Sequence, residues 1–251
     1  MTEKQKGRKA PTPAPTANPT RFYAIVGALA VAGAAVLYYL VKAPKDVAIP
    51  VPTTLTTADT AGFRGYLLGS PEAKVEIVEY ADFQCPACGS FDGLQFDVVK
   101  RQLIDSGVAR FRYRDFPLDQ LHPHARLAAH AAACADDQKK FWEMKRVIYD
   151  NQATWSATRS AGSLFRGYAG QAGLDQAAYD ACMTSKKFAG RIEASLKEGL
   201  ALGVASTPSF VIGGLMYRGA LSSDSISAIV RRTAAAAAPS GAGGAPAGST
   251  R

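Results

Sequence analysis

Four consecutive residues, Cys85-Pro86-Ala87-Cys88, carry the clearest chemical signal in this chain. They follow a short apolar run and precede a segment with helical periodicity. A cysteine at a helix N-terminus meets unpaired backbone N–H groups and the positive end of the helix dipole, which both stabilise a thiolate. Pro86 suits the first helical position because its fixed φ fits there and its missing N–H is not needed. We predict a dithiol redox centre in which Cys85 is the exposed nucleophile and Cys88, one turn deeper, is the resolving thiol.

The same Cys-x-x-Cys spacing also occurs in half of a zinc site. Structural zinc sites of that kind need four ligands, normally a second Cys-x-x-Cys or a spaced pair of histidines. The remaining cysteines, Cys134 and Cys182, are solitary, and the three histidines lack a zinc-finger spacing. The redox interpretation is therefore favoured, and it calls for neither a metal nor a dissociable cofactor.

Both ends of the chain differ in composition from a globular domain. Residues 1–21 carry five basic residues and one acidic residue, and they include a Pro/Thr/Ala-rich stretch typical of a disordered tail. Residues 22–41 are uncharged, long enough to cross about 30 Å of hydrocarbon, and aromatic at both ends. We predict an uncleaved anchor in a bacterial cytoplasmic membrane, with the N-terminus inside and the rest exported. A signal peptide cleaved after Ala30-Val31-Ala32 is the alternative, but it leaves an apolar start.

The net charge of +8 does not indicate nucleic-acid binding. The first 21 residues account for a net +4, and the exported part has a nearly balanced 24 basic and 20 acidic residues. We expect residues 42–61 to form a linker and residues 234–251 a low-complexity tail. Residues 62–233 are long enough for one well-packed domain, which we expect to be monomeric.

Beyond the Cys-x-x-Cys motif, hydrophobic periodicity predicts one helix and then a strand. The apolar positions of the helix are Phe91, Leu94, Val98 and Ile104, and Gly107 closes it. Residues 108–114 alternate, with Arg110, Arg112 and Arg114 on one face. We expect this arginine face to be solvated and to protect a sheet edge; binding of an anion is the alternative. The two strands flanking the helix should be parallel, joined by a right-handed crossover.

The rest of the domain is predicted to be helical until a closing hairpin. Residues 118–204 form a helical insertion, with breaks expected near Asp136, Asn151, Gly173 and Ser185. Residues 209–212 and 215–218 predict two short strands, joined by the two-residue hairpin signal Gly213-Gly214. A final helix spans about 223–236. The order βαβ, helices, ββα predicts an α/β thioredoxin fold with a helical insertion.

At this point the chain resembles the DsbA-type thiol:disulfide oxidoreductases, in particular a membrane-anchored bacterial branch whose active site reads VEYxDFxCPxC. The matching residues are Val78 to Cys88, while Phe141-Trp142-Glu143 and Thr207-Pro208 fall where that family has its insert helix and its cis-proline. The resemblance covers about residues 62–233. It implies that Pro208 is cis and packs against the disulfide, with Thr207, Pro86 and Ala87 contacting an extended substrate. An ordinary trans proline at a strand start is the alternative.

Glu79 precedes Cys85 by six residues on the incoming strand. The resemblance implies a buried acid there, below the disulfide, that relays the proton of Cys88 during catalysis. A solvated Glu79 is the alternative. Glu76 and Glu79 have opposite strand parity, so at most one of them should face the core.

The other two cysteines fall in the predicted insertion. In an exported protein an even cysteine count suggests pairing, so we predict a structural disulfide between Cys134 and Cys182. Two buried free cysteines are the alternative. His122-Pro123-His124 lies where a helix begins, so capping or packing explains it, and Trp142 and Trp155 are expected in the core.

We interpret the chain as an exported, membrane-tethered oxidase that introduces disulfides into exported client proteins with free thiols, on the periplasmic or extracellular side. The resemblance implies reoxidation by a quinone-linked membrane protein of the DsbB or VKOR type. A reductase or isomerase on the same fold is the first alternative. A thioredoxin-like module for binding or metal delivery is the second.

Overall fold

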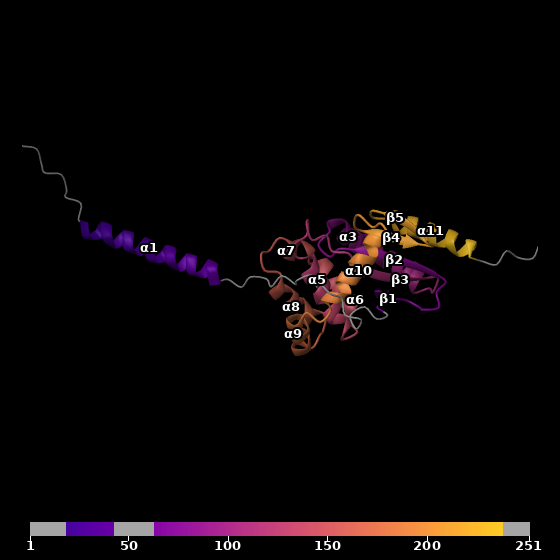
Figure 1. Cartoon of the computed structure of the whole chain (residues 1–251), viewed down its shortest axis with the longest axis horizontal. Helices are drawn as coiled ribbons and strands as arrows, with labels where there is room; N and C mark the ends of the chain where they lie inside the picture. The colour runs from indigo at the N-terminus through magenta and orange to yellow at the C-terminus, as the bar shows by residue number, and fades with distance from the viewer. Residues whose placement is uncertain (1–18, 43–62, 238–251) are drawn as a thin grey trace, which may run out of the picture. The chain divides into compact units, whose positions relative to one another are not determined.

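The structure is a computed structural model that describes residues 19–42 and 63–237 (Figure 1). The first of its two units contains helix α1 (Pro19–Lys42), and the second contains the rest of the described chain. In the described part of the chain, no helix has the length and apolar character needed to cross a membrane, so the anchor predicted over 22–41 is not supported. The predicted basic tail, linker and low-complexity tail lie outside the described residues, apart from the positions adjoining α1 and the last helix.

A mixed sheet forms the centre of the second unit, with strand order β1-β3-β2-β4-β5. The strands are β1 (Tyr66–Leu68), β2 (Val75–Ala81), β3 (Ala109–Asp115), β4 (Ser209–Ile212) and β5 (Leu215–Arg218). β2 and β3 are parallel, and the other neighbouring strands are antiparallel. The parallel pair and the closing hairpin confirm the predicted thioredoxin-like α/β fold. β1 was not predicted, because three residues are too few for a periodic signal.

The alternation of side chains along β2 separates the two faces of the sheet. Ile77 belongs to the main core, which also contains side chains of α3 (Pro86–Phe91) and α11 (Ser223–Ala236). Val78 and Tyr80 belong to a smaller cluster on the other face, which includes Leu196 of α10 (Ala189–Ala201). Glu79 shares the parity of Ile77 and is buried, whereas Glu76 is only half-buried. The prediction that at most one of these acids faces the core is therefore confirmed.

The helix that follows the Cys-x-x-Cys motif contains two π-helical segments, which the sequence did not predict. After α3 come η1 (Asp92–Phe96), α4 (Asp97–Val99) and η2 (Lys100–Ile104). A π-helical turn holds more residues than an α-helical turn, so the side chains that follow it are rotated about the axis. Leu94, predicted to be an apolar contact, is 71% exposed, whereas Phe96 and Leu103 are buried. The extent of the predicted helix is right, but the face assigned to Leu94 is wrong.

Helices α5 to α10 make up the predicted insertion. Their bounds are α5 (Ala125–Asp136), α6 (Phe141–Asp150), α7 (Gln152–Ser156), α8 (Gly162–Gln171), α9 (Gln176–Ser185) and α10 as given above. The breaks expected near Asp136, Asn151, Gly173 and Ser185 are all confirmed. Gly173 has a φ of +74°, a left-handed conformation that glycine adopts at little cost. Figure 1 shows α7, α8 and α9 gathered at one end of this unit, away from the hairpin of β4 and β5.

The arginine face of β3 is not a solvated sheet edge, contrary to our prediction. β3 lies between β1 and β2 in the sheet. Arg110 and Arg112 both bind Glu76 of β2, and Arg114 pairs with Glu198 of α10. The hydrogen bonds from Arg112 are the main cause that lowers the pKa of Glu76 to about 2. The alternating pattern identified the face correctly, but the acidic partners on other elements were not visible in it.

The last residue of β3, Asp115, is a buried carboxyl whose ionisation should oppose folding. Burial raises its pKa to about 7, although the nearby Arg114 acts in the opposite direction. The unfolded chain loses this proton near pH 4, so the contribution of Asp115 to the free energy of unfolding is most favourable below that pH and is lost as the pH rises toward 7. We expect Asp115→Asn to flatten this fall and to stabilise the protein at pH 7.5 by on the order of 2 kcal/mol. Urea denaturation at pH 4.5 and 7.5 tests this, with Asp150→Asn as the exposed control; equal pH dependence in wild type and Asp115→Asn would contradict it.

Candidate active site

Cys85 lies at the N-terminus of α3, as predicted. It is the N-cap residue, Pro86 begins the helix, and the Cys85 side chain forms no capping hydrogen bond. Cys85 and Cys88 are both unbonded. Cys85 is 7% exposed and Cys88 is fully buried, so Cys85 is the more accessible thiol but is less exposed than predicted. When protonated, the Cys85 thiol donates to the Thr207 carbonyl, which lies 3.3 Å from its sulfur.

The two thiols differ strongly in acidity. The pKa of Cys85 is lowered to about 5, first by the hydrogen bond from the Cys88 thiol, and further by the side-chain hydroxyl of Thr207 and by the N–H groups of Cys88 and Ala87, while burial acts against this. The pKa of Cys88 lies well above its ordinary value, mainly because of burial, and also because its thiol donates to Cys85 and lies near Glu79. At neutral pH this arrangement holds Cys85 as a thiolate and Cys88 as a thiol.

The dipeptide Thr207-Pro208 lies against the nucleophile. Its peptide bond is cis, as the resemblance implied. Thr207 is nearly buried beside the Cys85 sulfur. Pro86 and Ala87 are exposed at the start of α3. The structure thus brings the predicted substrate-contacting residues together around the Cys85 sulfur.

Glu79 lies in the core on the face of β2 that also carries Ile77. It is 1% exposed, and its Oε2 atom has no hydrogen-bond partner in the described part of the chain. Burial raises its pKa to about 8, with the charge of Lys145 lowering it and that of Asp92 raising it. An acid with a pKa in this range can give up or take up a proton near neutral pH, as a proton relay requires.

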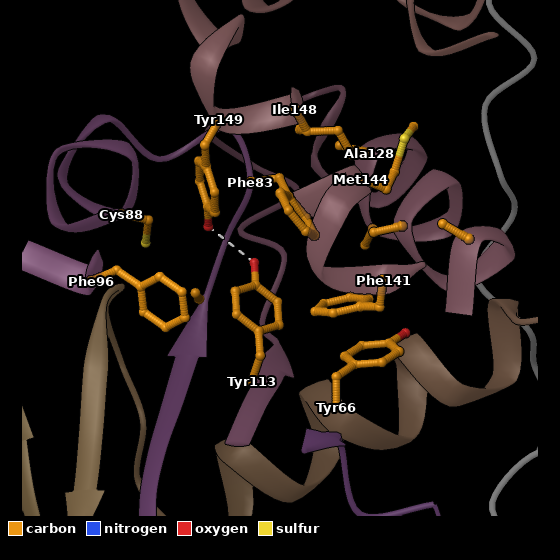
Figure 2. Close-up of a cluster of buried hydrophobic side chains, with 14 of the residues drawn as sticks. Tyr66, Phe83, Cys88, Phe96, Tyr113, Ala128, Phe141, Met144, Ile148 and Tyr149 are labelled. Carbon is orange, nitrogen blue, oxygen red and sulfur yellow. Dashed lines mark hydrogen bonds between the residues drawn. The ribbon is translucent and has the colours of Figure 1, made fainter. Parts of the chain in front are cut away.

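A buried charged pair behind the dithiol was missed by the sequence analysis. Lys145 of α6 binds Asp92 of η1, and both side chains are almost fully buried. The Lys145 Nζ atom lies 4.0 Å from the centre of the Phe96 ring. Next to it the hydroxyls of Tyr113 and Tyr149 meet at 3.0 Å, in the cluster that also contains Cys88 (Figure 2). Lys145 and Asp92 are 53 residues apart, so no local pattern could have paired them.

The turn that leads to Cys85 is held by the helical insertion. The Gln152 amide of α7 donates to the carbonyls of Phe83 and Cys85, at 2.7 and 2.9 Å. Its Oε1 atom lies 2.5 Å from where a Cβ atom on Gly89 would stand. Glycine at position 89 therefore lets Gln152 reach the active-site turn. Neither residue was singled out from the sequence, because their contact joins the first turn of one helix to another helix far along the chain.

The two histidines of His122-Pro123-His124 have different partners. His124 is the N-cap residue of α5 without a side-chain capping bond, and its Nε2 atom lies 2.9 Å from the Thr158 carbonyl. His122 Nδ1 lies 2.7 Å from the Asp82 carboxylate, three residues before the nucleophile. Packing was therefore an incomplete explanation for His122, because its partner belongs to the active-site turn.

Cys134 of α5 and Cys182 of α9 form a disulfide, which confirms the predicted pairing. Both residues are buried, at 1% and 5% exposure. His130 lies close enough for its ring and the two sulfur atoms to be within 4.8 Å of one another. Sulfur atoms bonded to each other offer no thiolate ligand, so this cluster is not a metal centre in its oxidised form.

The fold and the dithiol define a member of the thioredoxin family, and the family model described as Thioredoxin matches residues 64–232. This chain belongs to that family. It is similar to three solved structures, each with a TM-score of 0.62. Wolbachia pipientis alpha-DsbA1 is 22% identical, and the match covers 72% of this chain and 97% of that chain. Bacillus subtilis BdbD and Chlamydia trachomatis DsbA are each 19% identical; the matches cover 73% and 75% of this chain, and 97% and 100% of those chains, respectively. The resemblance to DsbA-type proteins is thus confirmed at the level of the fold. The predicted enzyme class, protein thiol:disulfide oxidoreductase, agrees with it.

The curated relatives that the chain matches are longer proteins. It is 34% identical over 174 residues to "Na(+)/H(+) antiporter NhaA 3" of Salinispora tropica, a match that covers 69% of this chain and 25% of that protein. It is also 32% identical to "Na(+)/H(+) antiporter NhaA 1" of Mycolicibacterium gilvum, and this match covers 62% of this chain and 24% of that protein. The chain therefore spans about a quarter of the length of these relatives.

Proposed function

We propose that this protein is a dithiol oxidase that introduces disulfides into exported proteins through Cys85 and Cys88. The observation that carries the proposal is the placement of the two thiols, with Cys85 at the N-terminus of α3 and Cys88 fully buried, which makes their acidities unequal. A stabilised Cys85 thiolate favours the reduced form of the enzyme, so its disulfide gives up its bond readily. Each tenfold gain in this stabilisation corresponds to about 30 mV toward a more oxidising disulfide.

The proposed reaction is two successive thiol–disulfide exchanges. A client thiolate attacks the Cys85 sulfur of the enzyme disulfide, the Cys85–Cys88 bond breaks, and Cys88 leaves as a thiolate that takes a proton from Glu79. A second client thiolate attacks the client sulfur of the mixed disulfide and releases Cys85 as a thiolate. The client has then lost two electrons and gained a disulfide, and the enzyme dithiol has gained those electrons. The Glu79 carboxylate recovers its proton when a client thiol ionises.

The residues around the Cys85 sulfur are suited to hold an extended client. In this proposal the backbone at Thr207 and the ring of Pro208 line one side of the mixed disulfide, and Pro86 and Ala87 line the other. When a client sulfur replaces the contact between the Cys85 thiol and the Thr207 carbonyl, backbone groups at Thr207 become available to a client strand. Pro86 and Ala87 carry no charge, so they place no electrostatic restriction on the client.

An oxidising compartment and a reoxidising partner complete the proposal. The Cys134–Cys182 disulfide favours a location outside the cytoplasm, such as the periplasm, where structural disulfides persist. Each turnover leaves the dithiol reduced, so a partner must remove two electrons. We assign this step to a quinone-linked membrane protein of the DsbB or VKOR type, the partner that the resemblance to DsbA-type proteins implies.

A disulfide isomerase is the second candidate. The chain is similar to the structure titled protein-disulfide isomerase from Novosphingobium aromaticivorans, with 25% identity, a TM-score of 0.56, and 67% of this chain and 96% of that chain covered. The deciding experiment gives the protein two substrates separately, a reduced unfolded protein and the same protein with scrambled disulfides. An oxidase, supplied as the disulfide form, restores activity to the reduced substrate faster. Recovery of only the scrambled substrate would make isomerase the better description.

The proposed relay makes a pH-dependent prediction for Glu79. Its protonated form is the proton donor, so the reduction step should slow as the pH rises toward about 8, the pKa of Glu79 beside the reduced dithiol, after correction for ionisation of the client thiol. We expect Glu79→Gln to slow this step by on the order of 100-fold and to remove its pH dependence, because an amide is no acid. Stopped-flow reduction of the enzyme disulfide by a small dithiol measures the step. Glu76→Gln, on the other face of β2, is the matched control; an unchanged rate profile in Glu79→Gln would contradict the relay.

A further inference from the structure

The carboxylate of Asp82 is fully buried three residues before the nucleophile. Its Oδ1 atom accepts the Gln84 N–H at 2.7 Å, and its Oδ2 atom accepts the Leu118 N–H at 2.8 Å. The same Oδ2 atom lies 2.7 Å from Nδ1 of His122. The Asp82 carbonyl accepts the N–H of Cys85 at 3.1 Å. Asp82 therefore joins the turn that ends at Cys85 to the loop that enters the helical insertion.

This junction lies at the edge of the sheet where the active site is built. β2 and β3 are parallel, and Ala81 and Asp115 are paired at their ends, so the chain segments that follow both strands leave the sheet side by side. One segment is the turn over residues 82–85, and the other is the loop over residues 116–124. Gln84 adds a second link, because its Oε1 atom accepts the His124 N–H at 2.7 Å.

Burial of a carboxylate is tolerated only where hydrogen-bond donors of the protein replace the water molecules that would solvate it. When one of these donors is removed, the surrounding structure must rearrange so that the carboxylate finds another donor or reaches solvent. Two of the Asp82 donors are backbone N–H groups, and His122 supplies the side-chain donor. The His122 side chain is 17% exposed, whereas the Asp82 side chain that it contacts has no exposed surface. Loss of this side chain should draw the Asp82 carboxylate, and with it the turn over residues 82–85, toward water.

The position of this turn controls the environment of the Cys85 sulfur. Cys85 is the N-cap residue of α3, and its own N–H is held by the Asp82 carbonyl, so a shift of Asp82 moves the Cys85 sulfur relative to the positive end of the helix. We propose that His122 is a positioning residue for the nucleophile: by holding the Asp82 carboxylate it keeps the turn over residues 82–85, and with it the Cys85 sulfur, in place at the N-terminus of α3 and beside the Thr207 carbonyl. The inference rests on the proposed function, because it concerns the thiolate on which that function depends.

The test compares three variants of the full chain. His122→Leu removes the donor and keeps a similar volume, while His122→Asn keeps a donor near the position of Nδ1. His124→Leu is the matched control, because it removes a histidine of the same loop that contacts the Thr158 carbonyl. The readout is the pKa of Cys85, measured from thiolate absorbance at 240 nm in the reduced protein. We expect a rise of about one pH unit in His122→Leu, and values close to wild type in the other two variants.

Three results would overturn the inference. They are an unchanged Cys85 pKa in folded His122→Leu, an equal rise in His124→Leu, and a rise in His122→Asn as large as that in His122→Leu. If His122→Leu does not fold by circular dichroism, His122→Gln takes its place, because the longer amide carries its donor past the Asp82 carboxylate and should raise the pKa where His122→Asn does not. A wild-type Cys85 pKa near that of a free cysteine would contradict the proposed function itself, so the two failures are distinguishable.

Discussion

Cys85→Ser should reduce thiol–disulfide exchange by on the order of 1,000-fold or more, to the rate of the buffer alone, because the variant lacks the sulfur that forms the covalent intermediate. Cys88→Ser should behave differently. Its Cys85 thiolate still attacks, but no neighbouring thiol remains to resolve the product. We therefore expect Cys88→Ser to accumulate mixed disulfides with client proteins and Cys85→Ser to accumulate none.

The trapping experiment expresses each variant in a bacterial envelope and separates the proteins without reduction. Mixed disulfides appear as bands that collapse to the monomer when a reductant is added, and mass spectrometry identifies the enzyme cysteine in each. The double variant Cys85→Ser/Cys88→Ser is the control for adducts at other cysteines. Equal trapping by the two single variants would contradict the assignment of nucleophile and resolving thiol.

Removal of the second disulfide should have the largest effect on stability. The Cys134–Cys182 bond closes a loop with a sequence separation of 48, and it links α5 to α9 within the insertion. In the chain-entropy model a loop of this length contributes about 4 kcal/mol. We expect Cys134→Ala/Cys182→Ala to lower the free energy of unfolding by that amount in urea denaturation, with exchange by Cys85 and Cys88 retained below the transition.

The two cysteine pairs should also separate by their resistance to reduction. The sulfurs of Cys134 and Cys182 are buried, so mild dithiothreitol should reduce the Cys85–Cys88 disulfide and leave the other bond intact. Alkylation of the treated protein followed by peptide mapping distinguishes the pairs. Free thiols at positions 134 and 182 in the native, untreated protein, or a double variant as stable as wild type, would contradict a structural role for this bond.

The parts of the fold that were predicted correctly are those encoded by nearby residues. The short apolar run of β2, the alternation along β3, the hairpin at Gly213-Gly214 and the helix ends in the insertion each depend on residues within one element and its flanks. The same holds for the start of α3, where Cys85 and Pro86 are adjacent in the sequence. A local signal is sufficient there because propensity, capping and turn geometry all act over a few residues.

The features that were missed depend on contacts between distant segments. Leu94 was assigned to the wrong face because π-helical turns change the phase of the helix without a mark in the apolar pattern. His122 and Asp82 are 40 residues apart, and Lys145 and Asp92 belong to different elements, so the partner of each is known only once the chain is folded. The arginines of β3 were placed on a solvated edge for the same reason. Their acids lie on β2 and α10, which the strand pattern alone does not bring beside them.

The proposed function requires the Cys85–Cys88 disulfide to be an oxidant, and the reduction potential of this disulfide decides whether it is one. The purified protein is equilibrated in glutathione buffers of defined potential, and the fraction of reduced Cys85 is measured by alkylation and mass spectrometry. Because Cys85 has a low pKa and Cys88 a high one, we expect a reduction potential less negative than about −200 mV, in the range of enzymes that donate disulfides. A potential near −270 mV, typical of thioredoxin-type reductants, would contradict the account.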